Sequence, residues 1–434
     1  MKITDRLEEI KVMRDPIHSY IHIEYALLWK IIDTPEMQRL RRIHQLGGNF
    51  QVYHTAEHSR FSHSLGVYEI VRRMLSEIPS LVQEVSEQEK IVLMAASLVH
   101  DIGHGPFSHL FERITHKHHE TMGKEILLDP STGIYKLLVQ YDQDLPDQIV
   151  SILERRHPKK ILSQVLCSQL DADRMDYLLR DSYATGTSYG KFDLERILRT
   201  LRVEDGLLCV KESGVHSIED YIMARYEMYW QVYLHPDAKS YDILILKLFE
   251  RYEAIRSKRR IEALEAFYRP MDPQTFFKLD DYRFYTIVHD LQEDRDPYLS
   301  DLANRIMNRR LFDWVREPKQ EMIDSIQEKL TRRKIPLSIY THEERLLEDM
   351  YLPYTERKKE EEIHVLDACG KICPLSAKSE IVKALLGMET KTCKYFYWQK
   401  ISEESQENRF FLLKKMSIML IYIRYDTRNC FKES

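Results

Sequence analysis

The sequence predicts a mainly α-helical protein with a smaller α+β region at its C-terminal end. Glycine and proline are scarce, at 13 and 15 of 434 residues, which indicates few turns between elements. Apolar residues recur at three- and four-residue steps from Ala26 onwards, as they do along amphipathic helices. Runs typical of strands appear again beyond residue 390. We therefore expect a helical domain over residues 1–315 and an α+β domain over 316–434.

The first elements are a short hairpin and a pair of helices. Val12 to Glu24 alternates in polarity around a turn at Asp15-Pro16. Helical spacing begins at Ala26, and Thr34-Pro35 divides it into two helices. Pro35 suits the first position of the second helix because proline lacks the N–H that would be unpaired there.

Two further helices are expected to form the centre of a bundle. Leu65 to Ile78 is amphipathic and has His63 near its start, whereas Ile91 to Val99 is almost wholly apolar and therefore buried. The buried helix ends at His100-Asp101, and Gly103 is expected to supply a left-handed cap. Adjacent residues inside a regular helix point about 100° apart. At a helix end, both can turn toward one ion.

Later segments continue this pattern and then change character. Leu162 to Leu179 and Ile218 to Tyr233 have helical spacing, and Glu344 to Glu362 is a charged, solvated stretch. Tyr395 to Trp398 and Met416 to Tyr425 are predicted strands. We expect the region 316–434 to act in oligomerisation and regulation.

The overall composition excludes several classes of protein. The formal net charge of −5 gives no general attraction to nucleic acid, so such a partner is not implied. No apolar run approaches the ~20 residues of a membrane span, and the N-terminus lacks the apolar core of a signal peptide. The six cysteines show no disulfide spacing, and Cys369 and Cys373 lack a second pair for structural zinc. We expect a reduced, cytoplasmic protein.

Histidines gather in one part of the sequence. Nine of the 18 lie between His54 and His119, with the adjacent pair His100-Asp101 among them. Imidazole nitrogens and carboxylate oxygens bind divalent transition ions, and further histidines transfer protons near neutral pH. The alternative is a set of buried polar residues that satisfy one another, which is disfavoured because unpaired buried charge is costly.

His63, the His100-Asp101 pair and Asp173 resemble the H…HD…D pattern of the HD phosphohydrolase superfamily. From about residue 10 to 315 the chain is similar to HD-domain dNTP triphosphohydrolases, both bacterial members and the animal enzyme with an additional SAM domain. The resemblance implies an HD-domain helical bundle as the core. It rests on Asp15-Pro16-Ile17-His18, Ile31-Ile32-Asp33-Thr34-Pro35, Gln38-Arg39-Leu40-Arg41, Gln45-Leu46-Gly47-Gly48, Arg60-Phe61-Ser62-His63-Ser64-Leu65-Gly66-Val67, His100 to Phe111, and Asp171 to Asp181.

The resemblance implies specific roles at the centre of the site. His63, His100, Asp101 and Asp173 would bind one divalent transition metal, which the sequence does not distinguish among Fe, Mn, Zn, Ni and Co. His119 would be the catalytic histidine, with His104, His109 and Glu112 as its supporting network. The family usually has aspartate at position 112, which leaves open whether the longer Glu112 meets His119. His116 and His118 are expected to face solvent.

A second implied set would contact a dNTP substrate. Its members are expected to bind the triphosphate, pack against the deoxyribose or read its hydroxyl edge, since arginine and lysine pair with phosphate oxygens. Alternatively, Arg60 and Arg174 neutralise nearby aspartates. The phosphate-binding segment of the family is matched loosely, by His235 and Lys239. The set is Gln45, Leu46, Arg60, Arg174, Tyr177, Asp181 and Lys239.

A third implied set would bind an activating nucleotide similar to GTP or dGTP. Asp33, Gln38 and Arg41 match positions that read guanine, and Val12, Arg196 and Arg309 match effector contacts made across subunits. Such a site implies a homo-oligomer, most simply a tetramer. The alternative is that these residues form ordinary surface ion pairs. Arg14 replaces an asparagine of the animal enzyme.

The expected reaction is metal-dependent hydrolysis of a dNTP to deoxynucleoside and triphosphate, with Mg²⁺ accompanying the nucleotide. Two alternatives remain open. One is another HD-type nucleotide phosphohydrolase, such as a 5′-nucleotidase or a cyclic-nucleotide or alarmone hydrolase. The other is a nucleotide-sensing or single-stranded-nucleic-acid-binding protein with weak catalysis. The preferred base and the identity of the effector are not determined by the sequence.

Overall fold

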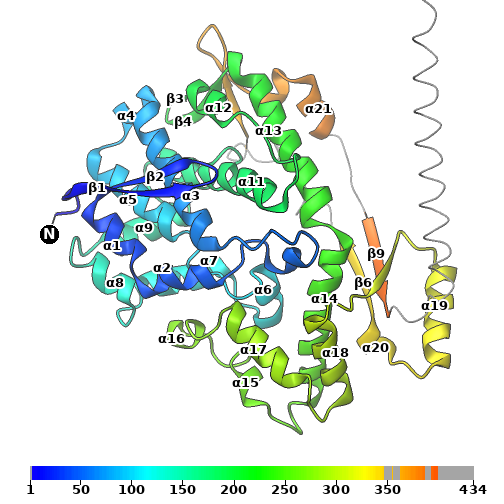
Figure 1. Cartoon of the computed structure of the whole chain (residues 1–434). Helices are drawn as coiled ribbons and strands as arrows, with labels where there is room; N and C mark the ends of the chain where they lie inside the picture. Colours follow the sequence, from blue (N-terminus) through cyan, green and yellow to red (C-terminus); the bar gives the residue numbers. More distant parts are fainter. Residues whose placement is uncertain (1, 347–353, 355–361, 387–391, 399–434) are drawn as a thin grey trace, which may run out of the picture. The chain divides into compact units, whose positions relative to one another are not determined.

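The structure is a computed structural model that describes residues 2–346, 354, 362–386 and 392–398 (Figure 1). The chain divides into two compact units. The first comprises Met1–Arg309 and Leu347–Lys391, and the second comprises Arg310–Leu346 and Thr392–Ser434. This division differs from the expected one over 1–315 and 316–434, because a later segment of the chain returns to the first unit.

A four-stranded sheet brings the later segment back. Strand β3 (Leu201–Glu204) pairs with β4 (Leu207–Lys211) as a hairpin. Strand β4 runs parallel to β7 (His364–Leu366), which pairs antiparallel with β8 (Ile372–Pro374). Parallel pairing joins segments that are distant in sequence, so hydrophobic periodicity alone does not reveal it.

The N-terminal hairpin is confirmed. Strands β1 (Arg6–Asp15) and β2 (Ser19–Tyr25) pair antiparallel, with Asp15 opposite Ser19. The Asp15 carboxylate accepts hydrogen bonds from the backbone N–H groups of Ile17 and His18, at 2.9 and 3.0 Å. Such a side-chain turn closes the hairpin.

The helices after the hairpin begin where the sequence indicates. Helix α1 (Ala26–Ile32) is followed by α2 (Pro35–Arg39), with Pro35 in the first turn of α2. The side chain of Thr34 accepts a hydrogen bond from the backbone N–H of Met37 and caps α2.

Three helices form the core around the histidine cluster. Helix α3 (Arg60–Glu77) packs on both α5 (Glu87–Val99) and α11 (Ala172–Thr185) (Figure 1). A capping box between Ser86 and Glu89 begins α5. Every residue from Ile91 to Val99 is buried, as the apolar run predicts. The start of α3, the end of α5 and the first turn of α11 supply the side chains of the candidate site.

The expected left-handed cap at Gly103 is wrong. The left-handed glycines of the described chain are Gly47, Gly186, Gly206 and Gly370. Gly103 is needed for close approach instead, because a Cβ there would lie 2.1 Å from the carbonyl oxygen of His119. The loop after α5 therefore packs directly against the start of the next site helix.

Two predicted continuous helices are interrupted. The first divides into α10 (Lys160–Leu166) and α11, and Asp171 caps α11 by accepting from the backbone N–H of Arg174 at 2.8 Å. The second runs as α13 (Val215–Met228) and then as a π-helix over Tyr229–Tyr233. π-helical turns are rare and often mark functional sites.

The remaining helices of the first unit surround this core. They are the short η1 (Leu40–Arg42), η2 (Gly47–Gln51) and η3 (Glu212–Gly214), together with α4 (Pro79–Glu84), α6 (His109–Thr115), α7 (His119–Leu128), α8 (Gly133–Leu138), α9 (Leu145–Leu153), α12 (Leu194–Thr200), α14 (Pro236–Ile255), α15 (Glu262–Glu265), α16 (Pro273–Phe276), α17 (Asp281–Leu291), α18 (Pro297–Met307), η7 (Leu375–Ala377) and α21 (Glu380–Leu386).

The second unit is a small α+β body. Strand β9 (Thr392–Tyr397) lies between β5 (Asp313–Arg316) and β6 (Thr341–Leu346) in an antiparallel sheet. Helix α19 (Gln320–Arg332) contributes Ile323, Ile326 and Leu330 to a core with Tyr395, and α20 (Leu337–Tyr340) leads into β6. The mainly α fold with a smaller α+β region is thus confirmed. The strand predicted at Met416 to Tyr425 and most of the stretch from Glu344 to Glu362 lie outside the described residues.

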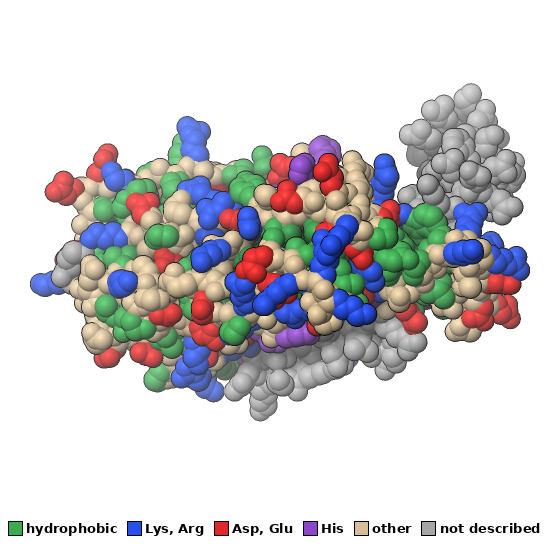
Figure 2. Space-filling model, turned by 90° about the horizontal axis from the view of Figure 1, so that it is seen from below, with side chains coloured by type: hydrophobic (Ala, Val, Ile, Leu, Met, Phe, Trp, Pro, Cys, Tyr) green, Lys and Arg blue, Asp and Glu red, His purple; other side chains and the backbone are tan. Residues whose placement is uncertain are grey.

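The surface carries mixed charge. Lysines and arginines are interspersed with acidic side chains on the face drawn in Figure 2. Within the described part of the chain, no helix combines the length and apolar character needed to cross a bilayer.

Candidate active site

Four side chains from three elements converge on one point. His63 stands in the first turn of α3, His100 and Asp101 follow the last residue of α5, and Asp173 lies in the first turn of α11. Nε2 of His63 is 3.0 Å from Oδ1 of Asp173 and 3.3 Å from Nε2 of His100. Nε2 of His100 is 3.5 Å from Oδ1 of Asp101.

The orientation of both imidazoles suits a metal ligand. Nδ1 of His63 is 2.8 Å from the carboxylate of Asp176, and Nδ1 of His100 is 2.9 Å from the backbone oxygen of Ser97. Each ring thus donates its Nδ1 proton outward and turns Nε2 toward the centre, which is the usual outer support of a metal-bound histidine. Two such nitrogens with two carboxylates fit a divalent transition ion.

A buried ionic network supports His63 from behind. The Asp176 carboxylate lies 2.6 Å from Nε2 of His18 and 2.8 Å from Nε of Arg180. Arg180 also pairs with Asp15 at 2.8 Å, which ties the hairpin turn to the core. All of these side chains are at least nine-tenths buried, so each charge depends on its partners.

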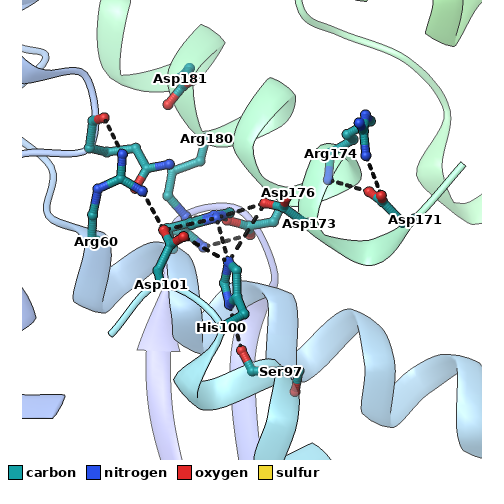
Figure 3. Close-up of polar contacts among 12 residues, drawn as sticks. Arg60, Ser97, His100, Asp101, Asp171, Asp173, Arg174, Asp176, Arg180 and Asp181 are labelled. Carbon is teal, nitrogen blue, oxygen red and sulfur yellow. Dashed lines mark hydrogen bonds and ion pairs between the residues drawn. The ribbon is translucent and has the colours of Figure 1, made fainter. Parts of the chain in front are cut away.

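Arg60 neutralises Asp101, one of the candidate ligands. Its guanidinium pairs with the Asp101 carboxylate (Figure 3). The same guanidinium donates to the Ser108 hydroxyl, from Nε at 2.9 Å and from Nη2 at 2.7 Å. Although burial alone would raise it, the pKa of Asp101 is held well below its usual range, mainly by the Arg60 charge. Asp101 therefore stays ionised, as a metal ligand must.

The candidate catalytic histidine stands beside this centre. His119 begins α7, and its Nδ1 is 2.5 Å from Oε1 of Glu112 on α6. The longer side chain of Glu112 therefore does meet His119. Burial opposes ionisation of Glu112, but hydrogen bonds with His109 and His119 hold its pKa well below the usual range. An ionised carboxylate at Nδ1 leaves Nε2 of His119 for proton transfer and stabilises the protonated ring.

His104 links the two groups. Its ring stacks on that of His119 with centroids 3.9 Å apart, and its Nε2 lies 3.3 Å from Oδ1 of Asp101. Burial and the nearby charge of Arg60 hold the pKa of His104 well below its usual value. A neutral His104 donates one proton to Asp101 and adds no charge beside the metal ligands.

Comparison with known proteins agrees with this geometry. A family model described as the HD domain matches residues 60–181. A second model, described as an HD associated region, matches residues 192–400. The chain belongs to the HD-domain phosphohydrolase family. The HD domain contains all four candidate metal ligands, and the chain is accordingly a metal-dependent hydrolase.

Relatives of the HD-domain chain cover most of its length. It is 38% identical over 404 residues to the Bacillus subtilis protein YwfO. The aligned region covers 90% of this chain and 93% of YwfO. The chain is 31% identical over 363 residues to the human deoxynucleoside triphosphate triphosphohydrolase SAMHD1. This aligned region covers 72% of this chain and 56% of the human protein. The crystal structure of a phosphohydrolase from Bacteroides thetaiotaomicron shares a TM-score of 0.80 at 28% identity, covering 90% of this chain and 100% of that one.

Several candidate substrate residues border one side of the HD metal centre. Asp181 accepts hydrogen bonds from the Tyr233 hydroxyl and from Nε2 of His58, both at 2.8 Å. The Tyr177 ring lies 6.4 Å from that of His63 and 6.2 Å from that of Tyr233. Figure 3 shows Arg60 and Asp181 on the same side of the ligand cluster.

Gln45 and Leu46 precede the short helix η2. The backbone N–H of Gln45 donates to His58 at 2.9 Å, and Arg60 reaches its backbone oxygen at 3.5 Å. Oε1 of Gln45 is buried and has no hydrogen-bond partner among the described residues. A buried acceptor without a partner is unfavourable, so this oxygen is available for a ligand hydroxyl.

Arg174 and Lys239 are each paired with an aspartate. Arg174 lies on the other side of the metal centre, where it pairs with Asp171 (Figure 3). It lines a cavity that also contains His119 and Asp173. Lys239 pairs with Asp242 at 3.4 Å in the first turns of α14. The structure thus groups Arg174 with the metal centre and gives Lys239 an ion pair within α14.

The candidate effector residues divide into two sets. Arg41 donates to the Gln38 side chain at 2.8 Å, and Gln38 donates to the backbone oxygen of Ile32, also at 2.8 Å. Exposed Asp33 follows Ile32 directly at the end of α1. The other three lie on separate elements: Val12 on β1, Arg196 on α12, where it donates to the Ser213 oxygen, and Arg309 after α18, where it donates to the Gln51 oxygen.

Sequence reasoning missed the outer support of the metal ligands. Asp176 lies three residues after Asp173 in the same helix and therefore on the same face. This spacing could have predicted that Asp176 lies near the candidate ligands. Arg180 follows one turn later. Ser108, His18 and Tyr233 gave no such signal, because their partners come from distant elements.

Proposed function

We propose that this protein is a dNTP triphosphohydrolase, which cleaves a dNTP to deoxynucleoside and inorganic triphosphate. The observation on which this rests most is the His119–Glu112 pair, joined through His104 to a four-ligand metal centre. The resemblance to SAMHD1, itself described as a dNTP triphosphohydrolase, supports the choice of substrate. The location we propose is the cytoplasm.

The metal ligands and His119 have distinct tasks in this proposal. A divalent ion held by His63, His100, Asp101 and Asp173 would activate a water and polarise a phosphoryl oxygen, with Mg²⁺ accompanying the nucleotide. His119 protonates the departing 5′-oxygen from Nε2 while Glu112 stabilises its positive charge. Arg60 is already paired with Asp101, so it serves as a fixed cation beside the substrate phosphates.

The remaining polar groups favour recognition of a deoxyribose. The unpartnered Oε1 of Gln45 would accept from a sugar hydroxyl. Tyr177 offers a ring for packing against the sugar, and Asp181 offers a second acceptor. Arg174 would exchange its Asp171 partner for a substrate phosphate, and Lys239 would also contact phosphate. Leu46 would screen the edge of the sugar.

Activation is proposed at Asp33, Gln38 and Arg41. Asp33 is exposed and would accept from a guanine edge, while Gln38 and Arg41 form a polar surface beside it. Val12, Arg196 and Arg309 would then contribute from other subunits of a homotetramer. A GTP-like or dGTP-like nucleotide is the proposed effector.

Product analysis tests the proposal directly. Metal-loaded protein is incubated with each dNTP alone, with the four mixed, and with GTP or dGTP added, and products are separated by ion-pair chromatography. We expect deoxynucleoside and intact triphosphate, formed faster in mixtures that contain the effector. Stepwise release of phosphate would favour a 5′-nucleotidase-like activity instead. No product from metal-loaded protein, with dNTP-dependent assembly, would favour a nucleotide sensor.

A further inference from the structure

A second group of metal-ligand side chains lies beside the first. His104, Glu112 and His119 each offer one ligand atom, and these atoms lie within 4.8 Å of one another. They come from the loop after α5, from α6 and from the start of α7. None of them belongs to the four-ligand centre built on His63 and Asp173.

Two more histidines point at the same carboxylate. Nδ1 of His118 is 3.3 Å from Oε2 of Glu112, and Nδ1 of His109 is 3.4 Å from Oε1. Neighbouring ligands of a tetrahedral ion with bonds near 2.1 Å are themselves separated by roughly 3.4 Å. The distances from Glu112 to His109 and His118 therefore approach those between neighbouring ligands of a zinc site. His118 has no task in the proposed reaction.

One nitrogen of the group is unused. Nδ1 of His104 is buried and has no hydrogen-bond partner among the residues that the structure describes. Since its Nε2 faces Asp101, Nδ1 keeps a free lone pair. At the outer edge, the side chains of His109 and His118 are 76% and 79% exposed, so an ion from solvent has a path to the group.

We infer that Glu112, His118 and His119 are the fixed ligands of a second transition-metal site, completed by His104 or His109. Zn²⁺ is the ion that this mixed imidazole and carboxylate set suits best. An ion bound there holds His119 as a ligand, so His119 does not act as a proton donor at the same time. Zn²⁺ at the second site therefore inhibits hydrolysis, a consequence that rests on the proposed function of His119.

Metal binding provides a test that does not depend on the substrate. Holoprotein with a verified ion at the first site is titrated with Zn²⁺ by calorimetry, and its zinc content is measured by mass spectrometry. We expect one further equivalent of Zn²⁺. Glu112→Gln should weaken its binding by more than tenfold, and His118→Ala by about tenfold. His116→Asn is the matched control, because His116 is an exposed histidine of the same loop with a left-handed backbone that asparagine tolerates.

Two results would overturn the inference. One is holoprotein that takes up no second equivalent of Zn²⁺. The other is a second equivalent that binds equally well to Glu112→Gln, since that ion would sit on surface histidines. In the activity assay, His118→Ala should need about tenfold more Zn²⁺ for half inhibition than wild type. If no dNTP hydrolysis is found, the binding measurement still decides whether the site exists.

Discussion

The carboxylate of Asp176 lies 2.8 Å from Nδ1 of His63 and turns the other nitrogen of that ring toward the metal centre. Asp176 is itself wholly buried between His18 and Arg180. The orientation of a metal ligand on α3 is therefore set by a charge on α11. We therefore expect metal affinity to depend on residues that do not touch the ion.

Asp176→Asn should lower metal affinity while leaving all four ligands in place. An amide at this position accepts a hydrogen bond from His63 more weakly than a carboxylate does. Substitution of a residue that hydrogen-bonds to a metal ligand typically lowers metal affinity 10–100-fold. Competition with a fluorescent chelator measures the change. Asp220→Asn, at an exposed position of α13, provides the control. Unchanged affinity in Asp176→Asn would show that His63 needs no such support.

Gly66→Ala should disrupt the same network by steric overlap. A Cβ at Gly66 would lie 1.9 Å from the Asp176 carboxylate and 2.3 Å from the Arg180 guanidinium. We expect a loss of about 3 kcal/mol in unfolding free energy, measured by denaturant titration. Gly123→Ala is the matched helical substitution. Its Cβ would meet nothing closer than 3.7 Å, so it should be neutral or stabilising.

His119→Ala should separate metal binding from turnover. His119 is outside the four-ligand centre, so the ion at that centre is retained. Because general acids typically contribute 10²–10⁴-fold to the rate, we expect turnover to fall by about that factor. Metal analysis and product chromatography on the same sample measure both effects. Full turnover in His119→Ala would remove the role assigned to this residue.

Arg155→Gly should stabilise the protein. Arg155 follows α9 with a φ of 58°, a left-handed conformation that glycine adopts without strain. We expect a gain of about 1 kcal/mol, seen as a higher melting temperature by calorimetry. The neighbouring Arg156→Gly has no left-handed backbone to relieve and should not stabilise. Equal effects of the two substitutions would contradict the explanation.

Stability should fall in acid through Glu265. Hydrogen bonds from Tyr252 and Arg256 lower the pKa of Glu265 to about 2. Because the folded pKa is below the unfolded value of about 4.3, this stabilisation is complete above pH 4.3 and is lost as the pH falls toward 2. Glu265→Gln should be less stable at pH 7 but lose less on going from pH 5 to 3. Melting temperatures across that range make the comparison.

The local elements could be predicted well from the sequence. The hairpin at Asp15, the apolar helix ending at Val99 and the strand at Tyr395 all follow from periodicity and turn residues. The structure brings His63, His100, Asp101 and Asp173 together, and their role as metal ligands stays a prediction. Their order along the chain and their positions at helix ends were readable without coordinates.

Other features depend on contacts between distant segments, which periodicity does not encode. The role of Gly103 is fixed by the carbonyl oxygen of His119, and the pairing of Arg174 with Asp171 occupies a side chain expected to bind phosphate. The π-helix at Tyr229–Tyr233 brings a hydroxyl to Asp181 through a backbone irregularity. Tertiary packing decides each of these.

The parallel pairing of β4 with β7 has a practical consequence for recombination between relatives. A chimera joined once, near residue 315, would combine β3 and β4 of one parent with β7 and β8 of the other in a single sheet. The two central strands, β4 and β7, would then each meet side chains selected against a different neighbour. Exchange of the small α+β unit therefore requires three crossovers, one after Arg309 and one on each side of the returning segment, so that Val210 keeps its native partner Val365.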